Sequence, residues 1–371
     1  MTSINIAALI MVKNEQHRIE ETIKSLTEFN GIIIYDTGST DSTLNIIKTT
    51  GDSLNIPVHI KLGSFVDFST SRNESLDFAD ECCLEYKYTH IVLLDANDQI
   101  VGSVKESLVG KNGPAYFVKQ ELKYSADEFV SFVNIKVLKA LCGLRFKGQV
   151  HEYIDKCYNA DRLEGFYIFQ DRTLDDNKSK LRWERDRIIL EKSYTVDPEN
   201  TRTLFYLAQT YDCLGELNLA YDYYEKRSKS IYGFEEEKWQ SLLKCGQISE
   251  QLGKLDRAEE WYFKAIAHTS RAESLICLAK LYMKKNKFDL AYTFANLACN
   301  LKYPKDALLF IEKKVYDYER WHIMGIVAWY AAQILNSSDI LIHGKKACEL
   351  AISAGNNIQL DKKNLLWYNE V

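Results

Sequence analysis

The chain has 371 residues, 46% of them hydrophobic and 27% charged, which is typical of a globular protein of two domains rather than of a disordered or membrane-embedded chain. Its 47 Lys and Arg residues against 52 Asp and Glu residues give a net charge of -5, so no overall positive field favours nucleic acid as a partner. Nine cysteines without a CxxC pair are typical of reduced thiols, and we therefore expect a cytoplasmic protein.

The first hundred residues alternate short apolar runs with helical periodicity. Four runs are predicted as strands: residues 4–12, 32–35, 58–62 and 90–94. The first of them is too short to span a membrane and lacks the features of a secretory signal, so no membrane span is expected. A helix is predicted between the first two strands, because the apolar residues at positions 19, 23, 26 and 29 would share one face. This alternation predicts βαβ crossovers and a mostly parallel sheet.

Two further β-rich stretches follow, at residues 115–124 and 131–138, and they are predicted to pair as a hairpin-like addition to the sheet. After residue 153 the β character fades. We therefore predict an α/β domain over residues 1–175. The segment KSKLRWERDR, which begins at Lys178, places several cations on a predicted helix, and we interpret residues 176–198 as a solvated linker helix.

Residues 199–371 are predicted to form an all-α domain of helical repeats. Two segments align with an offset of 38 residues, which places Gly215 on Gly253, and a third, looser copy follows. A degenerate fourth pair is predicted, with helices at residues 320–335 and 340–354. The series resembles tetratricopeptide helix pairs, which repeat at about 34 residues. An irregular helical domain without repeat symmetry is the alternative, and a homodimer formed through the repeats stays open.

Polar clusters follow the first two predicted strands, at the strand ends where open α/β sheets bind ligands. The first cluster is VKNE at residues 12–15, and the second is YDTGSTDST at residues 35–43. In the second, Gly38 allows a tight turn, and Ser39 or Asp41 would cap the next helix. Taken alone, each cluster is equally well explained as an ordinary capped βα turn.

Two more clusters carry carboxylates. LLDAND at residues 93–98 closes the most hydrophobic strand, and the carboxylate of Asp95 is the kind of oxygen ligand that hard cations prefer. VHE at residues 150–152 brings an imidazole and a carboxylate together, a candidate metal ligand beside a general base. The alternative for this last cluster is an edge-strand histidine with a solvated glutamate.

These four clusters and FSTSRNESLDFA, at residues 68–79, resemble in order the glycosyltransferase family 2 enzymes, which are inverting enzymes of the A-type glycosyltransferase fold. The resemblance covers about residues 5–155. It extends into the helical half, because DPENTRTLFYLAQTYDCLGE, which begins at Asp197, is similar to the segment that follows the catalytic domain in members with tetratricopeptide repeats. The resemblance implies a nucleotide-diphospho-sugar transferase type of α/β domain, followed by an all-α tetratricopeptide-like domain.

The resemblance also implies a donor-binding site. Asp36 and Glu15 would approach the base and ribose of the nucleotide, and Arg72 and Asn73 would lie near the diphosphate or the donor sugar. A guanidinium fork suits phosphate oxygens, although Arg72 is also compatible with an exposed position at a helix N-terminus. The full set of expected donor-binding residues is Val12, Asn14, Glu15, Asp36, Gly38, Ser39, Asp41, Arg72, Asn73 and Asp95.

A metal-binding DxD motif is implied at Asp95, but the sequence departs from it, since position 97 is Asn and one anionic ligand becomes a neutral amide. Mn²⁺ or Mg²⁺ could still bind, because an Asn oxygen is a legitimate hard ligand. The expected ligands are Asp95, Asn97 and His151, and Asp98 would compensate if the chain turned sharply after the strand.

The function implied is that of an inverting glycosyltransferase, hexosyl or N-acetylhexosaminyl, which moves a sugar from a nucleotide donor to a glycan or protein acceptor. A UDP-sugar is the expected donor, with GDP- and dTDP-sugars as alternatives. Catalysis is assigned to Asp95 and to Glu152 as the general base, with Asp127 or Glu128 as alternatives for the base. The competing hypothesis is a repeat-based protein-binding scaffold with an inactive glycosyltransferase-like domain.

Overall fold

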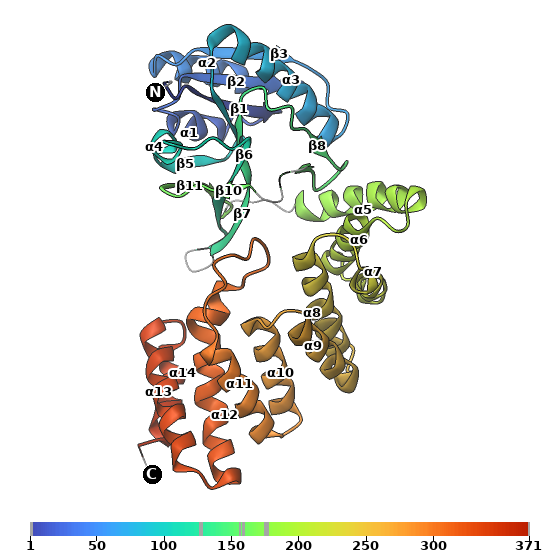
Figure 1. The fold of residues 1–371 in the computed structure, drawn as a ribbon, viewed down its shortest axis with the longest axis vertical. Helices are drawn as coiled ribbons and strands as arrows, with labels where there is room; N and C mark the ends of the chain where they lie inside the picture. The colour runs from blue at the N-terminus through green and yellow to red at the C-terminus, as the bar shows by residue number, and fades with distance from the viewer. Residues whose placement is uncertain (1–2, 126–128, 156, 158–159, 174–177, 370–371) are drawn as a thin grey trace. The chain divides into compact units, whose positions relative to one another are not determined.

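The computed structural model describes residues 3–125, 129–155, 157, 160–173 and 178–369 (Figure 1). The chain divides into two compact units, Met1–Lys178 and Ser179–Val371. None of the helices in these described ranges combines the length and the hydropathy of a membrane-spanning segment.

The first unit is built on a mixed sheet. Within the described residues its strands run in the order β3 (Val58–Leu62), β2 (Gly31–Asp36), β1 (Ile6–Val12), β4 (His90–Leu94), β7 (Phe129–Lys139), β6 (Ala115–Lys123), β11 (Phe166–Asp171) and β5 (Gln99–Gly102), and β10 (Asp161–Arg162) pairs with β6. The four strands from β3 to β4 are parallel, whereas β7 pairs antiparallel with both β4 and β6. The predicted α/β architecture is thus confirmed, including the β6–β7 hairpin, with a parallel half and a mixed half.

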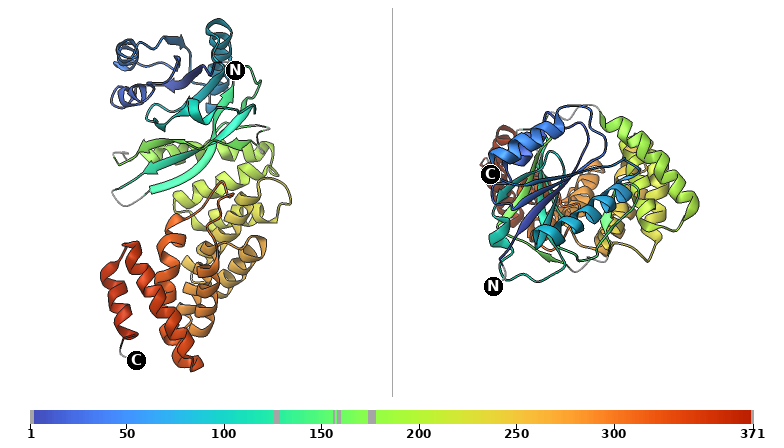
Figure 2. Two further views of the ribbon diagram at one scale, coloured as in Figure 1. Left: turned by 60° about the vertical axis from the view of Figure 1, so that its left-hand side comes forward. Right: turned by 90° about the horizontal axis from the view of Figure 1, so that it is seen from above.

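Helices cover both faces of this sheet and enclose two apolar cores (Figure 2). On one face lie α1 (Ile19–Lys24), α2 (Thr43–Ser53) and α4 (Val104–Ser107), and on the other lies α3 (Phe68–Tyr86). The central strands β1, β2 and β4 are buried on both sides, which explains their nearly continuous apolar sequences. A small ribbon of β8 (Phe146–Lys147) and β9 (Tyr153–Ile154) packs near α3.

Of the strands among the described residues, five were not predicted from the sequence: β5, β8, β9, β10 and β11. The expectation that β character fades after residue 153 is wrong, because Phe166–Asp171 forms β11, and Gln99–Gly102 forms β5. β11 alternates buried and half-buried residues over only six positions. Its partners, β6 and β5, are distant in sequence, so the local pattern alone carries a weak signal.

The second unit is a series of antiparallel helix pairs. The helices are α5 (Lys178–Val196), α6 (Thr201–Cys213), α7 (Leu217–Lys229), α8 (Glu235–Gln251), α9 (Leu255–His268), α10 (Ala272–Lys284), α11 (Phe288–Asn300), the short π-helix η1 (Val315–Glu319), α12 (Arg320–Leu335), α13 (Ser338–Ala354) and α14 (Ile358–Trp367). Gly215 and Gly253 occupy equivalent turns with positive φ angles of 79° and 72°, and Asn286 takes the same position with φ of 56°. The tetratricopeptide-like repeat series is therefore confirmed. An irregular stretch at residues 301–312 separates α11 from the last pairs.

Helix α5 belongs to this second unit and is more than a solvated linker. Tyr211 on α6 donates a hydrogen bond of 2.6 Å to Glu191 on α5, and the rings of Tyr194 and Tyr223 pack edge to face at 5.3 Å. Leu190 is buried as well. These contacts fix α5 against the first helix pair.

Candidate active site

The turns after β1 and β2 bind one another through side-chain hydrogen bonds. The amide of Asn14 donates to the hydroxyl of Ser39 at 3.0 Å, and Asn14 Oδ1 accepts from the amide of Thr40 at 2.7 Å. Asp36, at the carboxyl end of β2 and only 2% exposed, accepts from the amides of Gly38 and Ser39. The φ angle of Gly38 is 101°, a conformation that favours glycine.

The structure thus brings the predicted donor residues of these two turns together. The amide of Glu15 donates to the hydroxyl of Thr43 at 2.7 Å, and Asp41 accepts from the amide of Thr43 at 3.0 Å at the start of α2. Val12 pairs with Asp36 in the sheet register. The N-cap position of α2 is Ser42, whose side chain makes no capping hydrogen bond, and not the predicted Ser39 or Asp41. The role of these turn residues in donor binding stays a prediction.

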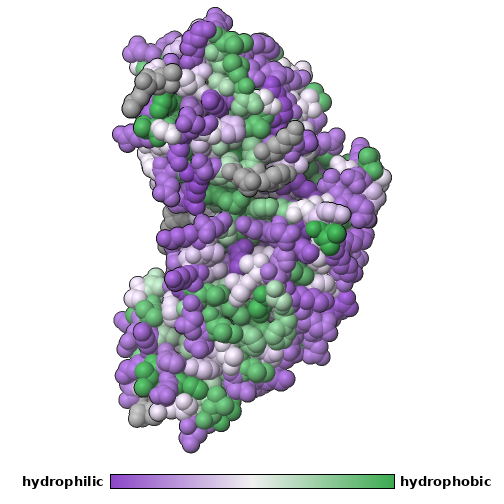
Figure 3. Space-filling model, in the orientation of Figure 1, coloured by the Kyte–Doolittle hydropathy of each residue, from purple (hydrophilic) through white to green (hydrophobic). Residues whose placement is uncertain are grey.

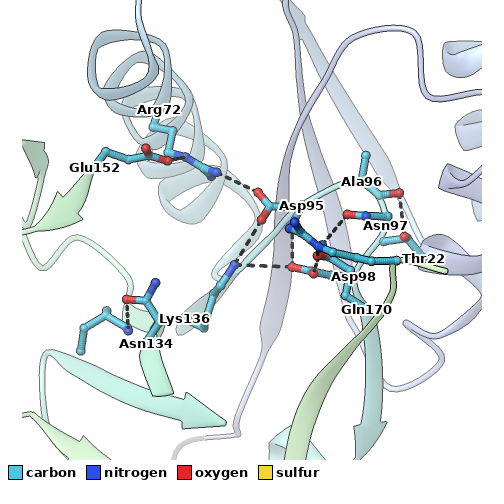
Figure 4. Close-up of polar contacts among 12 residues, drawn as sticks. Thr22, Arg72, Asp95, Ala96, Asn97, Asp98, Asn134, Lys136, Glu152 and Gln170 are labelled. Atoms are coloured by element: carbon cyan, nitrogen blue, oxygen red, sulfur yellow. Dashed lines mark hydrogen bonds and ion pairs between the residues drawn. The ribbon is translucent and has the colours of Figure 1, made fainter. Parts of the chain in front are cut away.

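A chain of charged side chains lies at the end of β4 (Figure 4). Arg72, from the first turns of α3, donates from Nη2 to Asp95 Oδ1 at 2.7 Å and from Nε to Glu152 Oε1 at 2.6 Å. A single guanidinium group therefore joins the two residues that the sequence assigns to catalysis. The predicted exposed position for Arg72 is not observed, since its side chain is largely buried.

Lys136 extends this chain from the middle of β7. Its Nζ lies 3.6 Å from Asp95 Oδ2 and 3.5 Å from Asp98 Oδ2, and its side chain is 8% exposed. Asp98 is fully buried, and its carboxylate also accepts from the amide of Asp95 at 2.9 Å and from Gln170 Nε2 at 3.0 Å. Lys136 and Gln170 thus fix the loop between β4 and β5 through their contacts with Asp98.

The surrounding charges shift the pKa values of these groups. Lys136, and then Arg72, hold the pKa of Asp95 well below its usual range, so Asp95 is ionised. Burial raises the pKa of Asp98 although Lys136 opposes the shift. Burial alone would lower the pKa of Lys136, but the carboxylates of Asp95 and Asp98 outweigh it and raise that pKa.

These residues line a cavity of about 200 Å³. Its charged lining residues are Arg72, Asp95, Lys136, Glu152 and Arg172. Aliphatic side chains also line it, together with aromatic and amide side chains from β6, β7, β11 and the β8–β9 ribbon, namely Gln120, Phe132, Asn134, Phe146, Tyr153 and Gln170. A polar cavity that combines ionised groups with aromatic faces at the carboxyl end of a parallel strand has the composition expected of a ligand site.

Other predicted residues lie elsewhere. The amide of Asn73 is used on both sides by the backbone of Phe146, at 3.0 Å and 2.7 Å, so it anchors β8 and does not line the cavity. His151 is exposed in a left-handed turn with φ of 52°. Asp127 and Glu128, the alternative bases, lie outside the described residues.

The predicted metal ligands do not form a metal centre by themselves in this arrangement. Both carboxylate oxygens of Asp95 contact cations, and Asn97 Oδ1 accepts from Gln170 Nε2 at 2.6 Å. Asp98 is fully buried, and its carboxylate contacts Lys136, Gln170 and the amide of Asp95, so its role as a ligand stays a prediction. Across the described ranges, no three His, Cys, Asp or Glu side chains are grouped so as to hold a metal ion.

Sequence reasoning missed Lys136, Gln170 and Gln120. Lys136 gave no signal of its own, because Asn134 and Lys136 alternate with Val133, Ile135 and Val137 on β7, and the pattern expects solvated residues at those polar positions. The two glutamines gave no signal either, since a glutamine in a strand is usually a solvated residue.

Comparison with known proteins identifies the first unit. Residues 8–112 match the family described as glycosyl transferase family 2. These residues form a family 2 glycosyltransferase domain. The matched segment contains the turns after β1 and β2 as well as Arg72 and Asp95 of this domain, and it ends before Lys136 and Glu152.

Two curated relatives are similar over a longer stretch. They are the SPbeta prophage-derived glycosyltransferase SunS of Bacillus subtilis (strain 168) and the glycosyltransferase SunS of Bacillus phage SPbeta. Each is 26% identical over 248 residues, which cover 62% of this chain and 54% of the relative. The chain therefore spans about half the length of the curated relatives it matches.

Among solved structures, MamA covers 47% of this chain with 19% identity and a TM-score of 0.35, and 92% of MamA is matched. PilF of Pseudomonas aeruginosa covers 52% of this chain with 14% identity and a TM-score of 0.36, and 75% of it is matched. Because both scores are low, the repeat architecture is established from the helix pairs of the chain itself.

Proposed function

We propose that this protein is an inverting glycosyltransferase that moves a hexosyl or N-acetylhexosaminyl group from a UDP-sugar to a glycan or protein acceptor. The observation that carries the proposal is the pair of hydrogen bonds from Arg72 to Asp95 and Glu152, at the end of β4 in the family 2 domain. It joins a cation suited to phosphate with a carboxylate suited to proton transfer beside one cavity.

Arg72 has a double role in this proposal. Its guanidinium can exchange the two carboxylates for oxygens of the donor diphosphate. Carboxylates and phosphates are both anions that accept paired hydrogen bonds from a guanidinium group. That exchange frees Glu152, which then accepts the proton of the acceptor as its nucleophilic atom attacks the anomeric carbon and the bond to the diphosphate breaks. Before the donor binds, Glu152 is held by Arg72 at 2.6 Å.

A divalent cation is proposed as part of the donor complex. The side chain of Asp95 is 42% exposed and is the motif carboxylate that can reach ligand in the cavity. Mn²⁺ or Mg²⁺ would then need the diphosphate oxygens in addition. Calorimetric titration of UDP with and without Mn²⁺ tests this, and Asp95→Asn should abolish the effect of the metal. The matched variant Asn97→Asp should tighten metal binding if position 97 contributes an oxygen.

The repeats offer a site for the acceptor. A cavity of about 620 Å³ is lined by α8, α9 and α10, including Gln247, Tyr262 and Met283. On the face of this unit drawn in Figure 3, hydrophobic residues gather in a patch that hydrophilic residues border. Met283→Glu should raise the KM for the acceptor and leave the KM for the donor unchanged. Leu219→Glu, at an exposed position on α7, is the matched control.

The activity itself is tested with purified protein and a panel of nucleotide sugars, by detecting the released nucleoside diphosphate and the glycosylated acceptor. Removal of a general base typically lowers the rate by about 10²- to 10⁴-fold, so Glu152→Gln should lower kcat in that range and leave donor affinity nearly unchanged. Glu164→Gln, an exposed acid of the same unit, should behave as the wild type.

Two outcomes would contradict the proposal. A fully active Glu152→Gln protein would remove Glu152 as the base. An absence of turnover and of nucleotide binding with every UDP-, GDP- and dTDP-sugar would favour the repeat-based scaffold, whose ligand would then be sought at the cavity of α8, α9 and α10.

A further inference from the structure

Gln120, on β6, is a buried polar residue that the site described above does not use. Its side chain is 5% exposed and lines the cavity. In the sheet register it lies opposite Phe132 on β7 and beside Ile168 on β11. Within the described part of the chain, its amide group makes no hydrogen bond.

The neighbouring glutamine shows how unusual this is. Gln170, on β11, donates to Asn97 at 2.6 Å and to Asp98 at 3.0 Å, and its oxygen accepts from Arg172. Its amide is thus used at both ends. The amide atoms of Gln120 are not sealed from solvent but reach the cavity, where they can hydrogen-bond a bound molecule in place of water. An unpartnered amide on a cavity wall therefore indicates a ligand group that completes it.

The surroundings of Gln120 indicate the chemistry of that ligand. Phe132, Phe146 and Tyr153 line the same cavity and offer apolar ring faces, and an amide offers one acceptor and two donor hydrogens. Aromatic faces with a few neutral polar groups suit a molecule with C–H faces and hydroxyl edges, which describes a pyranose ring. Arg72 and Asp95 line the same cavity, and the Arg72 guanidinium lies 5.4 Å from the centre of the Phe146 ring.

We infer that Gln120 determines donor-sugar specificity by hydrogen bonding a hydroxyl of the hexose ring of the nucleotide sugar. This inference rests on the proposed function. The diphosphate meets Arg72, and the sugar lies against the aromatic and amide wall. The amide can donate to one hydroxyl and accept from its neighbour, so it distinguishes sugars by the presence and orientation of adjacent hydroxyls.

The test compares wild type with Gln120→Leu, which removes the amide but suits a position between Leu122 and Phe132. Binding of UDP, GDP and dTDP, of their hexose conjugates, and of monodeoxy analogues of the hexose that binds is measured by calorimetry without acceptor. The nucleoside diphosphate should bind both proteins equally. The nucleotide sugar should bind Gln120→Leu about three- to ten-fold more weakly, the range expected for one neutral hydrogen bond.

The monodeoxy analogue that lacks the hydroxyl bound by Gln120 should bind the wild type more weakly than the full nucleotide sugar does, by the same factor. It should bind wild type and Gln120→Leu with equal affinity. Equal binding of every nucleotide sugar by the two proteins would overturn the inference, as would equal losses for the diphosphate and its sugar conjugate. An effect confined to the KM of the acceptor would also overturn it, because Gln120 would then contact the acceptor. A wild-type protein that binds no nucleotide at all would instead remove the proposed function, and this inference with it.

Thermal melting of both proteins shows whether the variant folds. If Gln120→Leu melts well below the wild type, Gln120→Met is the second variant, since its unbranched side chain follows the path of glutamine. The same loss of sugar discrimination is expected from it, and retained discrimination in a folded Gln120→Met protein would overturn the inference.

Discussion

Replacing Lys136 with methionine would leave the carboxylate of Asp98 buried without its cation. Asp98 is fully buried, and Lys136 Nζ is 3.5 Å from its Oδ2. At an effective dielectric constant of about 20, two unit charges at this separation attract by about 5 kcal/mol. Methionine preserves the long apolar stem of the side chain, so the change removes charge more than packing.

The expected net loss is smaller than this attraction. Removing one partner of a buried pair typically lowers the free energy of unfolding by about 3–5 kcal/mol. Asp98 retains hydrogen bonds from the amide of Asp95 and from Gln170, and burial already raises its pKa, so it can take up a proton. We therefore expect a loss of about 3 kcal/mol. In a unit of this size that lowers the melting temperature by about 6–12 °C.

Calorimetric melting of the full chain measures this change, and tryptophan fluorescence separates the two units. The six tryptophans all lie after residue 178, so their fluorescence reports the second unit and should not change. Lys139→Met, at an exposed position of the same strand, is the matched control and should stay within about 0.5 kcal/mol of wild type. The double variant Lys136→Met/Asp98→Asn should be less destabilised than the sum of its two single variants, by at least about 1 kcal/mol.

The reasoning fails if Lys136→Met melts like Lys139→Met, or if the double variant equals the sum of the single variants. Either result would mean that Lys136 does not interact with the Asp98 carboxylate in the folded protein.

Three further predictions concern other parts of the chain. Burial alone would raise the pKa of Asp67, but hydrogen bonds from Thr70 and Ser69 outweigh it and lower that pKa, so Asp67→Ala should cost about 1 kcal/mol at neutral pH. This difference should shrink as the pH falls below the ordinary pKa of an Asp carboxyl, about 3.9, and be lost once the pH passes through the lower pKa of the folded state. Urea unfolding across this pH range measures it. Burial raises the pKa of the Cys213 thiol, but Cys213 is the exposed cysteine of the nine, so at alkaline pH one thiol should react faster with a disulfide reagent than the others, and Cys213→Ser should abolish that fast phase. Gly246→Ala would place a Cβ atom 2.4 Å from the ring of Tyr262, so melting should show a loss of about 1–3 kcal/mol despite the better helix propensity of alanine.

Local hydrophobic patterns were sufficient to predict those helices and strands whose apolar residues lie within one contiguous segment. The predicted strands at residues 58–62 and 90–94 have the observed bounds, and the predicted helix at residues 320–335 is α12. The turn glycines Gly215 and Gly253 were aligned correctly because each repeat needs a left-handed residue at that point. β11 was missed because its six residues form a strand only by pairing with β6 and β5, which are distant in the sequence.

The sequence by itself determined the two-part architecture, the family of the first unit and the positions of Arg72, Asp95 and Glu152, because strand ends, turns and motif order are properties of contiguous residues. Only the tertiary structure showed that Arg72 bridges the carboxylates of Asp95 and Glu152, and that Lys136 and Gln170 hold the loop after β4. It also showed that the Asn73 side chain hydrogen-bonds the backbone of β8. It also placed Gln120 on the cavity wall, where none of the described residues hydrogen-bonds its side chain. The physical reason is that a side chain's neighbours across a sheet come from strands far apart in sequence, and charge, burial and hydrogen bonding depend on those neighbours.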